Sequence, residues 1–166
     1  MILFTSDLLF GSKILGAAKH AGLRGQGVRN RASLAQHAPT ATHYFLDLEA
    51  ELAEGESADE LLDAALGHPH LCVFAFAGHV QADKLRAAQA RLAQAAARRA
   101  EHGESAEGAE SAESAAGAAG AEGAQDDAPA QESPRHEIQP RHEVHSRGSL
   151  ASRLHLILPP RTTEQA

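Results

Sequence analysis

Two aspartates stand where apolar runs end, and they are the residues of this sequence best placed to do chemistry. Asp47 follows the run His43–Leu46, and Asp7 follows Met1–Thr5 with Ser6 between them. Short apolar runs bounded by turn formers are typical of buried strands. In a parallel sheet, ligands gather past the carboxyl ends of strands that lie about 5 Å apart. Asp7 and Asp47 are therefore predicted to share an acidic pocket, which suits weak binding of a hard cation such as Mg²⁺.

A second interpretation of Asp47 stays open from these residues alone. Aspartate is a preferred helix N-cap, and the acidic residues that follow Asp47 are compatible with a helix. Asp47 would then be a structural cap and not a reactive group. The nearby Asp7 favours the acidic pocket.

Two other patterns carry less weight. The glycines at 22, 25 and 27 resemble a phosphate-binding loop, but they follow an expected helix and not a strand. His68 and His70 flank a turn without a third ligand at a fixed offset, so we expect no zinc site there. His79 is interpreted as a surface loop residue, and His136, His142 and His145 as solvated side chains.

The charge is distributed unevenly along the 166 residues. Residues 1–100 hold ten basic and ten acidic side chains, whereas residues 101–143 hold eleven acidic side chains against two arginines. The net charge of −7 therefore comes from the second stretch. The near-neutral first part lacks the basic field that nucleic-acid binding needs, and we expect no nucleic-acid partner.

The sequence also indicates the compartment. Cys72 is the only cysteine and lies in an apolar run, as expected for a small buried side chain in a reducing environment. The N-terminus has no basic region typical of a signal peptide. No stretch approaches the roughly 20 apolar residues of a membrane span. We expect a soluble, cytoplasmic protein that does not contact a membrane.

Strand and helix patterns alternate along the chain, which predicts an α/β fold with a parallel sheet, right-handed crossovers and helices on both faces. Glycines weaken the second strand and suggest an edge position, whereas Ser57 and Glu60 match a capping box before the third helix. The expected strands are residues 2–5, 23–29, 43–48, 71–76 and 143–145, and the expected helices are 8–21, 32–37, 58–66, 81–99 and 149–158.

The alternation is interrupted before the last strand. Residues 101–141 consist mainly of Ala, Glu, Gly and Ser, with Ile138 as the only large aliphatic side chain. Such a segment cannot bury enough surface to offset its chain entropy, so it is predicted to be a disordered acidic insertion. Residues 1–100 and 142–158 then form one domain, and residues 159–166 form a polar tail.

The order of these elements resembles the receiver domain of two-component response regulators. In that family the phospho-accepting aspartate ends the third strand, and Phe45-Leu46-Asp47-Leu48 is similar to the family motif. The resemblance covers about residues 1–92 and 142–158. It implies a doubly wound, flavodoxin-like sheet of order 2-1-3-4-5, with Asp47 as the phospho-acceptor.

This chain departs from the family at the other switch positions. The family has two acidic residues after the first strand, where this chain has Ser6-Asp7. The family has Thr or Ser after the fourth strand, where this chain has Ala77-Gly78, and it has Lys after the fifth, where this chain has Arg147. The planar guanidinium of arginine is not equivalent to a lysine ammonium. The resemblance is therefore to atypical, or pseudo-receiver, members.

Three functions are compatible with these residues to different degrees. The first is a non-enzymatic signalling module that contacts partner proteins and in which phosphorylation is lost or impaired. The second is a phospho-accepting receiver of a phosphorelay that uses Asp47 and Mg²⁺. The third, a small hydrolase, is disfavoured because the sequence has no Gly-x-Ser-x-Gly motif, no phosphate loop and no spaced Ser/His/Asp set. The sequence does not name a partner.

Overall fold

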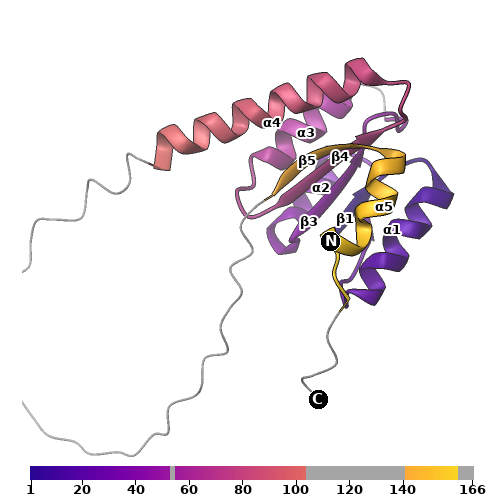
Figure 1. Cartoon of the computed structure of the whole chain (residues 1–166). Helices are drawn as coiled ribbons and strands as arrows, with labels where there is room; N and C mark the ends of the chain where they lie inside the picture. Colours follow the sequence, from indigo (N-terminus) through magenta and orange to yellow (C-terminus); the bar gives the residue numbers. More distant parts are fainter. Residues whose placement is uncertain (53–54, 104–140, 161–166) are drawn as a thin grey trace, which may run out of the picture.

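A computed structural model describes residues 1–52, 55–103 and 141–160 of the chain. These residues form an α/β fold built on a five-stranded parallel sheet of order β2-β1-β3-β4-β5. This confirms the predicted fold class and strand order (Figure 1). The strands are β1 (Ile2–Phe4), β2 (Gln26–Gly27), β3 (His43–Asp47), β4 (Cys72–Ala77) and β5 (His142–Ser146).

The helices cover both faces of the sheet. One face carries α1 and α5, and the other carries α2, α3 and α4 (Figure 1). Their bounds are α1 (Leu8–His20), α2 (Arg31–His37), α3 (Ala58–Leu66), α4 (Ala82–Gly103) and α5 (Arg147–Ile157), with a 3₁₀ turn η1 (Ala38–Thr40) after α2. The described part of the chain contains no helix long and apolar enough to cross a membrane.

Side-chain caps set the starts of several helices. The predicted capping box is present at α3, where the Ser57 hydroxyl accepts from the Glu60 N–H at 3.2 Å and the Glu60 carboxylate accepts from the Ser57 N–H at 2.9 Å. Helix α5 begins two residues earlier than predicted, because Ser146 caps it by accepting from the Ser149 N–H. That shift places Arg147 in the first turn of the helix.

The second strand is shorter than predicted. Only Gln26 and Gly27 pair with β1, and both are exposed at the edge of the sheet. Glycine without a side chain to pack weakens a strand, which is consistent with this short edge. The sheet therefore depends on β1, β3, β4 and β5.

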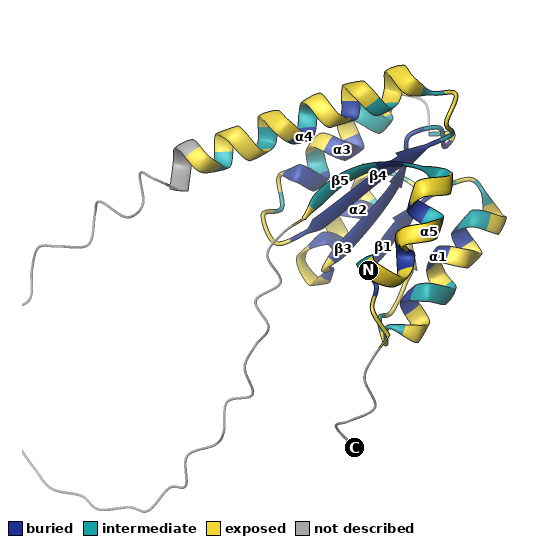
Figure 2. Ribbon diagram, in the orientation of Figure 1, coloured by how far each residue is buried: buried dark blue, intermediate teal, exposed yellow. Residues whose placement is uncertain are grey.

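Successive side chains along each strand point to opposite faces of the sheet, and this divides the core into two layers. Tyr44 and Leu46 of β3 pack toward α2, α3 and α4, whereas Phe45 packs toward α1 and α5. The Phe45 and Phe74 rings stack with centroids 5.1 Å apart. β3 and β4 are buried along their whole length, as Figure 2 shows in dark blue. Cys72 is buried in β4, as predicted.

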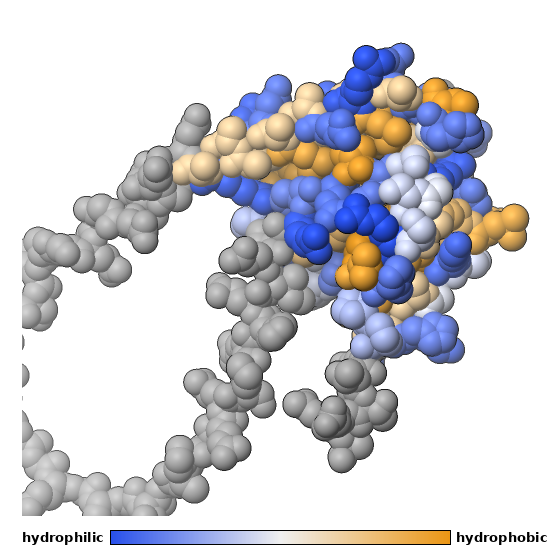
Figure 3. All heavy atoms as spheres, in the orientation of Figure 1, coloured by the Kyte–Doolittle hydropathy of each residue, from blue (hydrophilic) through white to orange (hydrophobic). Residues whose placement is uncertain are grey.

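The long fourth helix runs beyond the sheet. It continues to Gly103, a few residues past its predicted end, and Figure 1 shows its last turns projecting from the sheet. In Figure 3 weakly apolar colouring follows this alanine-rich helix. The predicted disordered insertion falls mostly on residues 104–140, which lie outside the described residues.

Candidate functional site

The parallel register brings the ends of four strands to one edge of the sheet. Asp47 is paired with Phe76, and Ala77 is paired with Ser146. The residues that follow β1, β3, β4 and β5 therefore meet at one place, as expected for the carboxyl edge of such a sheet. A carboxylate cluster made of Asp7, Asp47 and Glu49 lies there around one arginine.

Asp47 lies at the base of the cluster and has no exposed surface. Its Oδ2 accepts from the Thr5 hydroxyl at 2.7 Å, and its Oδ1 accepts from the Glu49 N–H at 3.1 Å. Arg147 Nη2 lies 3.1 Å from Oδ2 and 3.3 Å from Oδ1. Burying a charged carboxylate requires such pairing and hydrogen bonding. Both oxygens are therefore already engaged.

Asp47 is not a helix cap. The next helix, α3, begins at Ala58 and is capped by Ser57. Among the described residues, Asp47 accepts a backbone hydrogen bond from the Glu49 N–H, in the turn directly after β3. The capping interpretation left open by the sequence is therefore wrong for Asp47.

Arg147 provides the positive charge of the site. Its Nη2 lies 3.3 Å from Glu49 Oε2, and its Nη1 lies 3.6 Å from Asp7 Oδ2. With the contacts to Asp47, one guanidinium faces three carboxylates that follow different strands. A planar fork with several donors can satisfy such an arrangement better than an ammonium group can. The Arg147 side chain is one-third exposed, so the cluster opens to solvent on this side.

Asp7 has a structural role as well. Its Oδ1 accepts from the Phe10 N–H at 2.9 Å and caps α1, while its Oδ2 faces Arg147. Asp7 and Asp47 are thus brought to the same arginine, as the shared pocket requires. Ser6 is exposed, and no hydrogen bond of its side chain is found among the described residues.

The end of β4 carries no side-chain donor. Ala77 is fully buried, and the Gly78 N–H donates to Glu49 Oε2 at 2.5 Å. A Cβ atom at Gly78 would lie 3.1 Å from the same oxygen, so the close approach favours glycine. Lys84, on the first turn of α4, donates to the Leu48 carbonyl at 3.2 Å instead of to a carboxylate.

Two members of the site were not singled out from the sequence. Thr5 was interpreted as the last residue of an apolar strand, and Glu49 as part of a polar connection. Both lie within two residues of a strand end, and that position is the signal by which they could have been found. Each binds Asp47 through the contacts given above.

The arrangement does not fit a divalent cation as it stands. The carboxylate oxygens that would ligate Mg²⁺ face the Arg147 guanidinium, whose nitrogens lie 3.1 to 3.6 Å from them. A metal ion would have to displace this side chain. Within the described ranges, no group of three or more His, Cys, Asp or Glu side chains is arranged to hold a metal.

Comparison with known proteins assigns no family to the chain: no protein-family model, no curated protein and no solved structure matches it.

Proposed function

We propose that this protein is a receiver-like signalling module that acts through protein contacts and in which phosphorylation of Asp47 is lost or impaired. The observation that carries the proposal is the complete burial of Asp47, with both carboxylate oxygens bonded. The sheet order and the aspartate at the end of β3 support the receiver-like part.

Burial opposes the chemistry of a phospho-acceptor. Phosphoryl transfer needs the attacking oxygen roughly in line with the leaving group, with cations that neutralise the developing charge. The Asp47 oxygens point at Thr5, Glu49 and Arg147 and not at solvent. An acyl phosphate at Asp47 would carry about −1.5 to −2 charge in place of the single negative charge of the carboxylate, and so would add negative charge beside Asp7 and Glu49. The single guanidinium already faces these three carboxylates.

The end of β4 supports the loss of switching. In the family that this chain resembles, a hydroxyl there senses the phosphoryl oxygens, whereas Ala77 has none. Its neighbour Gly78 is bound to Glu49 through its N–H. Modification of Asp47 would therefore have no side chain at Ala77 through which to reach the surface.

A phospho-accepting receiver remains the second candidate because of one observation. The Arg147 side chain is one-third exposed and belongs to the first turn of α5. If it rotates away from the cluster, Asp47 and Asp7 become available to Mg²⁺ and a phosphodonor. The second candidate therefore requires that Arg147 leaves the cluster.

The test combines mass measurement with amide hydrogen exchange. The protein is incubated with Mg²⁺ and a small-molecule phosphodonor, with Asp47→Asn as the control. We expect no stoichiometric mass gain and no change of exchange around residues 77–80. A stoichiometric gain that Asp47→Asn abolishes, with altered exchange there, would establish the phosphorelay function instead.

A further inference from the structure

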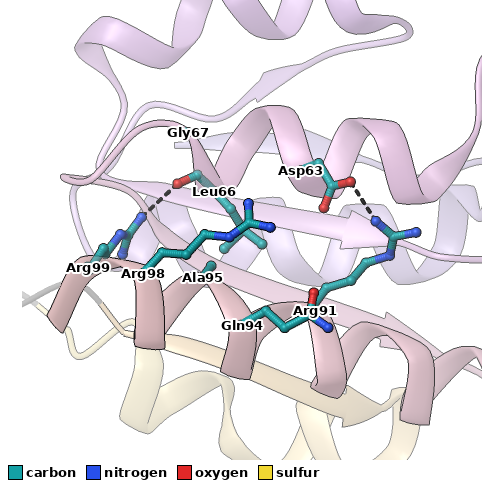
Figure 4. Close-up of a pocket in the computed structure, with 8 residues that line it drawn as sticks. All are labelled: Asp63, Leu66, Gly67, Arg91, Gln94, Ala95, Arg98 and Arg99. Atoms are coloured by element: carbon teal, nitrogen blue, oxygen red, sulfur yellow. Dashed lines mark hydrogen bonds and ion pairs between the residues drawn. The ribbon is translucent and has the colours of Figure 1, made fainter. Parts of the chain in front are cut away.

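A second site lies between α3 and α4, at the opposite end of the sheet from Asp47. It is a cavity of about 720 Å³, and we call it the arginine groove. It lies beside Leu66 and Gly67, which precede β4, whereas the carboxylate cluster lies where the strands end. The residues that define it here are Asp63, Leu66, Gly67, Arg91, Arg98 and Arg99 (Figure 4).

Three arginines and one aspartate give the groove an excess of positive charge. Arg91 is neutralised by Asp63 at 2.5 Å and by Asp59 at 3.0 Å. Arg99 donates to the Leu66 carbonyl at 2.8 Å and contacts the His142 ring. Arg99 thus fixes one end of the groove but keeps its charge.

Arg98 is the arginine that is available to a ligand. It is exposed and forms no ion pair within the part of the chain that the structure describes. Figure 4 shows its side chain reaching from α4 into the space between Arg99 and Arg91, over Leu66. An exposed guanidinium beside an apolar side chain and a second arginine is suited to carboxylates, which arginine binds through two parallel hydrogen bonds.

We propose that the arginine groove binds acidic peptide segments and that its occupant is residues 104–140 of the same chain. This segment holds nine acidic side chains, with Arg135 as its only basic residue. The groove offers the opposite charge and the Arg98 guanidinium, which has no ion pair among the described residues. The carboxylate cluster around Asp47 is acidic and does not offer this complementarity.

The described residues that flank the segment on both sides lie near the arginine groove. The described chain stops at Gly103, four residues after Arg99, and resumes at Arg141. Arg141 precedes His142, whose ring contacts Arg99. A single exposed ion pair contributes only about 0–1 kcal/mol, but a short tether raises the effective concentration to about the millimolar range. Tethering therefore allows weak contacts to occupy the groove.

If residues 104–140 occupy the arginine groove, they restrict the binding of other acidic segments there. An acidic partner segment would have to compete with residues 104–140 for Arg98. Exposed charges are screened over about 10 Å at 0.1 M salt, so both kinds of binding should weaken as salt rises. The charge of the arginine groove does not depend on the chemistry of Asp47, and binding there is observed at Leu66, Gly67 and Arg98.

The first experiment compares full-length chains by NMR. In one variant the nine acidic residues of 104–140 are replaced by Gln or Asn. In the control variant the residues of 104–140 are placed in scrambled order, so that the segment keeps its composition and charge. We expect the amide signals of Leu66, Gly67 and Arg98 to shift in the neutral variant and to stay in the charged control. High salt should move the native signals toward those of the neutral variant. Circular dichroism checks that the fold is retained.

The second experiment adds a synthetic peptide of sequence 104–114 to the neutral full-length variant. Saturable shifts at the arginine groove are expected, with none for a peptide in which Gln replaces Glu. Arg98→Ala should weaken this binding by about fivefold, the upper range for one exposed ion pair. Identical spectra for the native and neutral chains would exclude the chain's own segment as the occupant. Shifts confined to other arginines, such as Arg153, would exclude the groove.

Discussion

Arg147 Nη2 lies 3.1 Å from Asp47 Oδ2, and these two residues are 100 positions apart in the chain. The aspartate ends β3, and the arginine begins α5. One of the pair is fully buried and the other is one-third exposed. The ion pair therefore fastens the last helix to the centre of the sheet, and it governs both stability and access to Asp47.

Removing the arginine should destabilise the fold. Arg147→Ala leaves the buried Asp47 carboxylate without its cation, and breaking a buried pair in this way costs about 3–5 kcal/mol. We expect about 2–3 kcal/mol, because the Arg147 side chain is one-third exposed and water can replace part of the interaction. Urea denaturation at pH 7 measures the loss. The stability of Arg147→Lys should lie between those of the native protein and Arg147→Ala, because an ammonium keeps the charge but lacks the planar fork.

The matched control for this prediction is Arg153→Ala. Arg153 is half exposed, and its Nη1 lies 3.8 Å from Glu143 Oε2. Exposed pairs of this kind contribute about 0–1 kcal/mol. Equal losses for Arg147→Ala and Arg153→Ala would show that Asp47 does not depend on its ion pair.

Tyr44→Phe should stabilise the protein. Tyr44 is fully buried, and its hydroxyl has no hydrogen-bond partner among the described residues. Burial also raises the pKa of this phenol well above its usual value, so it stays neutral. Removing an unsatisfied buried hydroxyl should raise the free energy of unfolding by about 1 kcal/mol. Thermal and urea unfolding measure the gain. A loss of more than about 1 kcal/mol would mean that the hydroxyl is bonded in solution.

Phe74→Ala should cost about 3–5 kcal/mol, the usual range for deleting a buried aromatic ring. Phe74 is 2% exposed and stacks on Phe45 in the layer that α1 and α5 cover. Val80→Ala is the control, because Val80 is 75% exposed. It should change stability by less than about 0.5 kcal/mol. A loss below about 1 kcal/mol for Phe74→Ala would contradict its central position.

The buried His43 should make stability depend on pH. Burial, and after it the positive N-terminus, lower the pKa of His43 to about 4. The unfolded chain therefore binds this proton near pH 6.5, and the folded chain binds it only near pH 4. Stability should fall as the pH falls between these values, by up to about 1.4 kcal/mol per pH unit from this group.

Urea titrations at several pH values measure this dependence. His43→Gln removes the titrating ring, so its stability should decline less steeply than that of the native protein between pH 6.5 and 4. Above pH 7 the difference between the two proteins should be constant. Parallel declines for both proteins in the acid range would show that His43 is readily protonated in the fold.

The acidic segment should be dispensable for folding. Replacing residues 104–140 by a short Gly/Ser linker removes almost no large apolar side chain, since Ile138 is the only one. We expect the melting temperature to change little, because exposed ion pairs to the arginine groove contribute weakly. A large fall would mean that the segment joins the core.

The fold could be predicted from the sequence because its signals are local. Runs apolar on both faces, such as the one that became β4, are typical of strands buried inside a parallel sheet. The Ser57 capping box fixed the start of α3 to the residue. Boundaries were less certain where the local signal was weak. The second strand comprises only Gln26–Gly27 and is shorter than predicted. Helix α5 begins after the Ser146 cap, earlier than the spacing of its apolar residues indicated.

The site was only partly predictable. Asp47, Asp7 and Arg147 could be singled out because each closely follows a strand end. The hydrogen bonds and ion pairs among these three residues could not be predicted, because they depend on side-chain directions that the register of four strands determines. Thr5 and Glu49 complete the shell around Asp47 from positions that look like ordinary strand and loop residues. Burial of the Asp47 carboxylate is a property of this assembly and not of any local motif.

The position of Arg147 also determines the order in which the site is made during synthesis. Residues up to Gly103 supply four of the five strands and all three carboxylates, whereas Arg147 is translated 44 residues later. At about 5–20 residues per second, this delay is roughly 2 to 9 seconds. During that time Asp47 has no cation, so burying it is unfavourable. The 37 residues from 104 to 140 account for most of this delay.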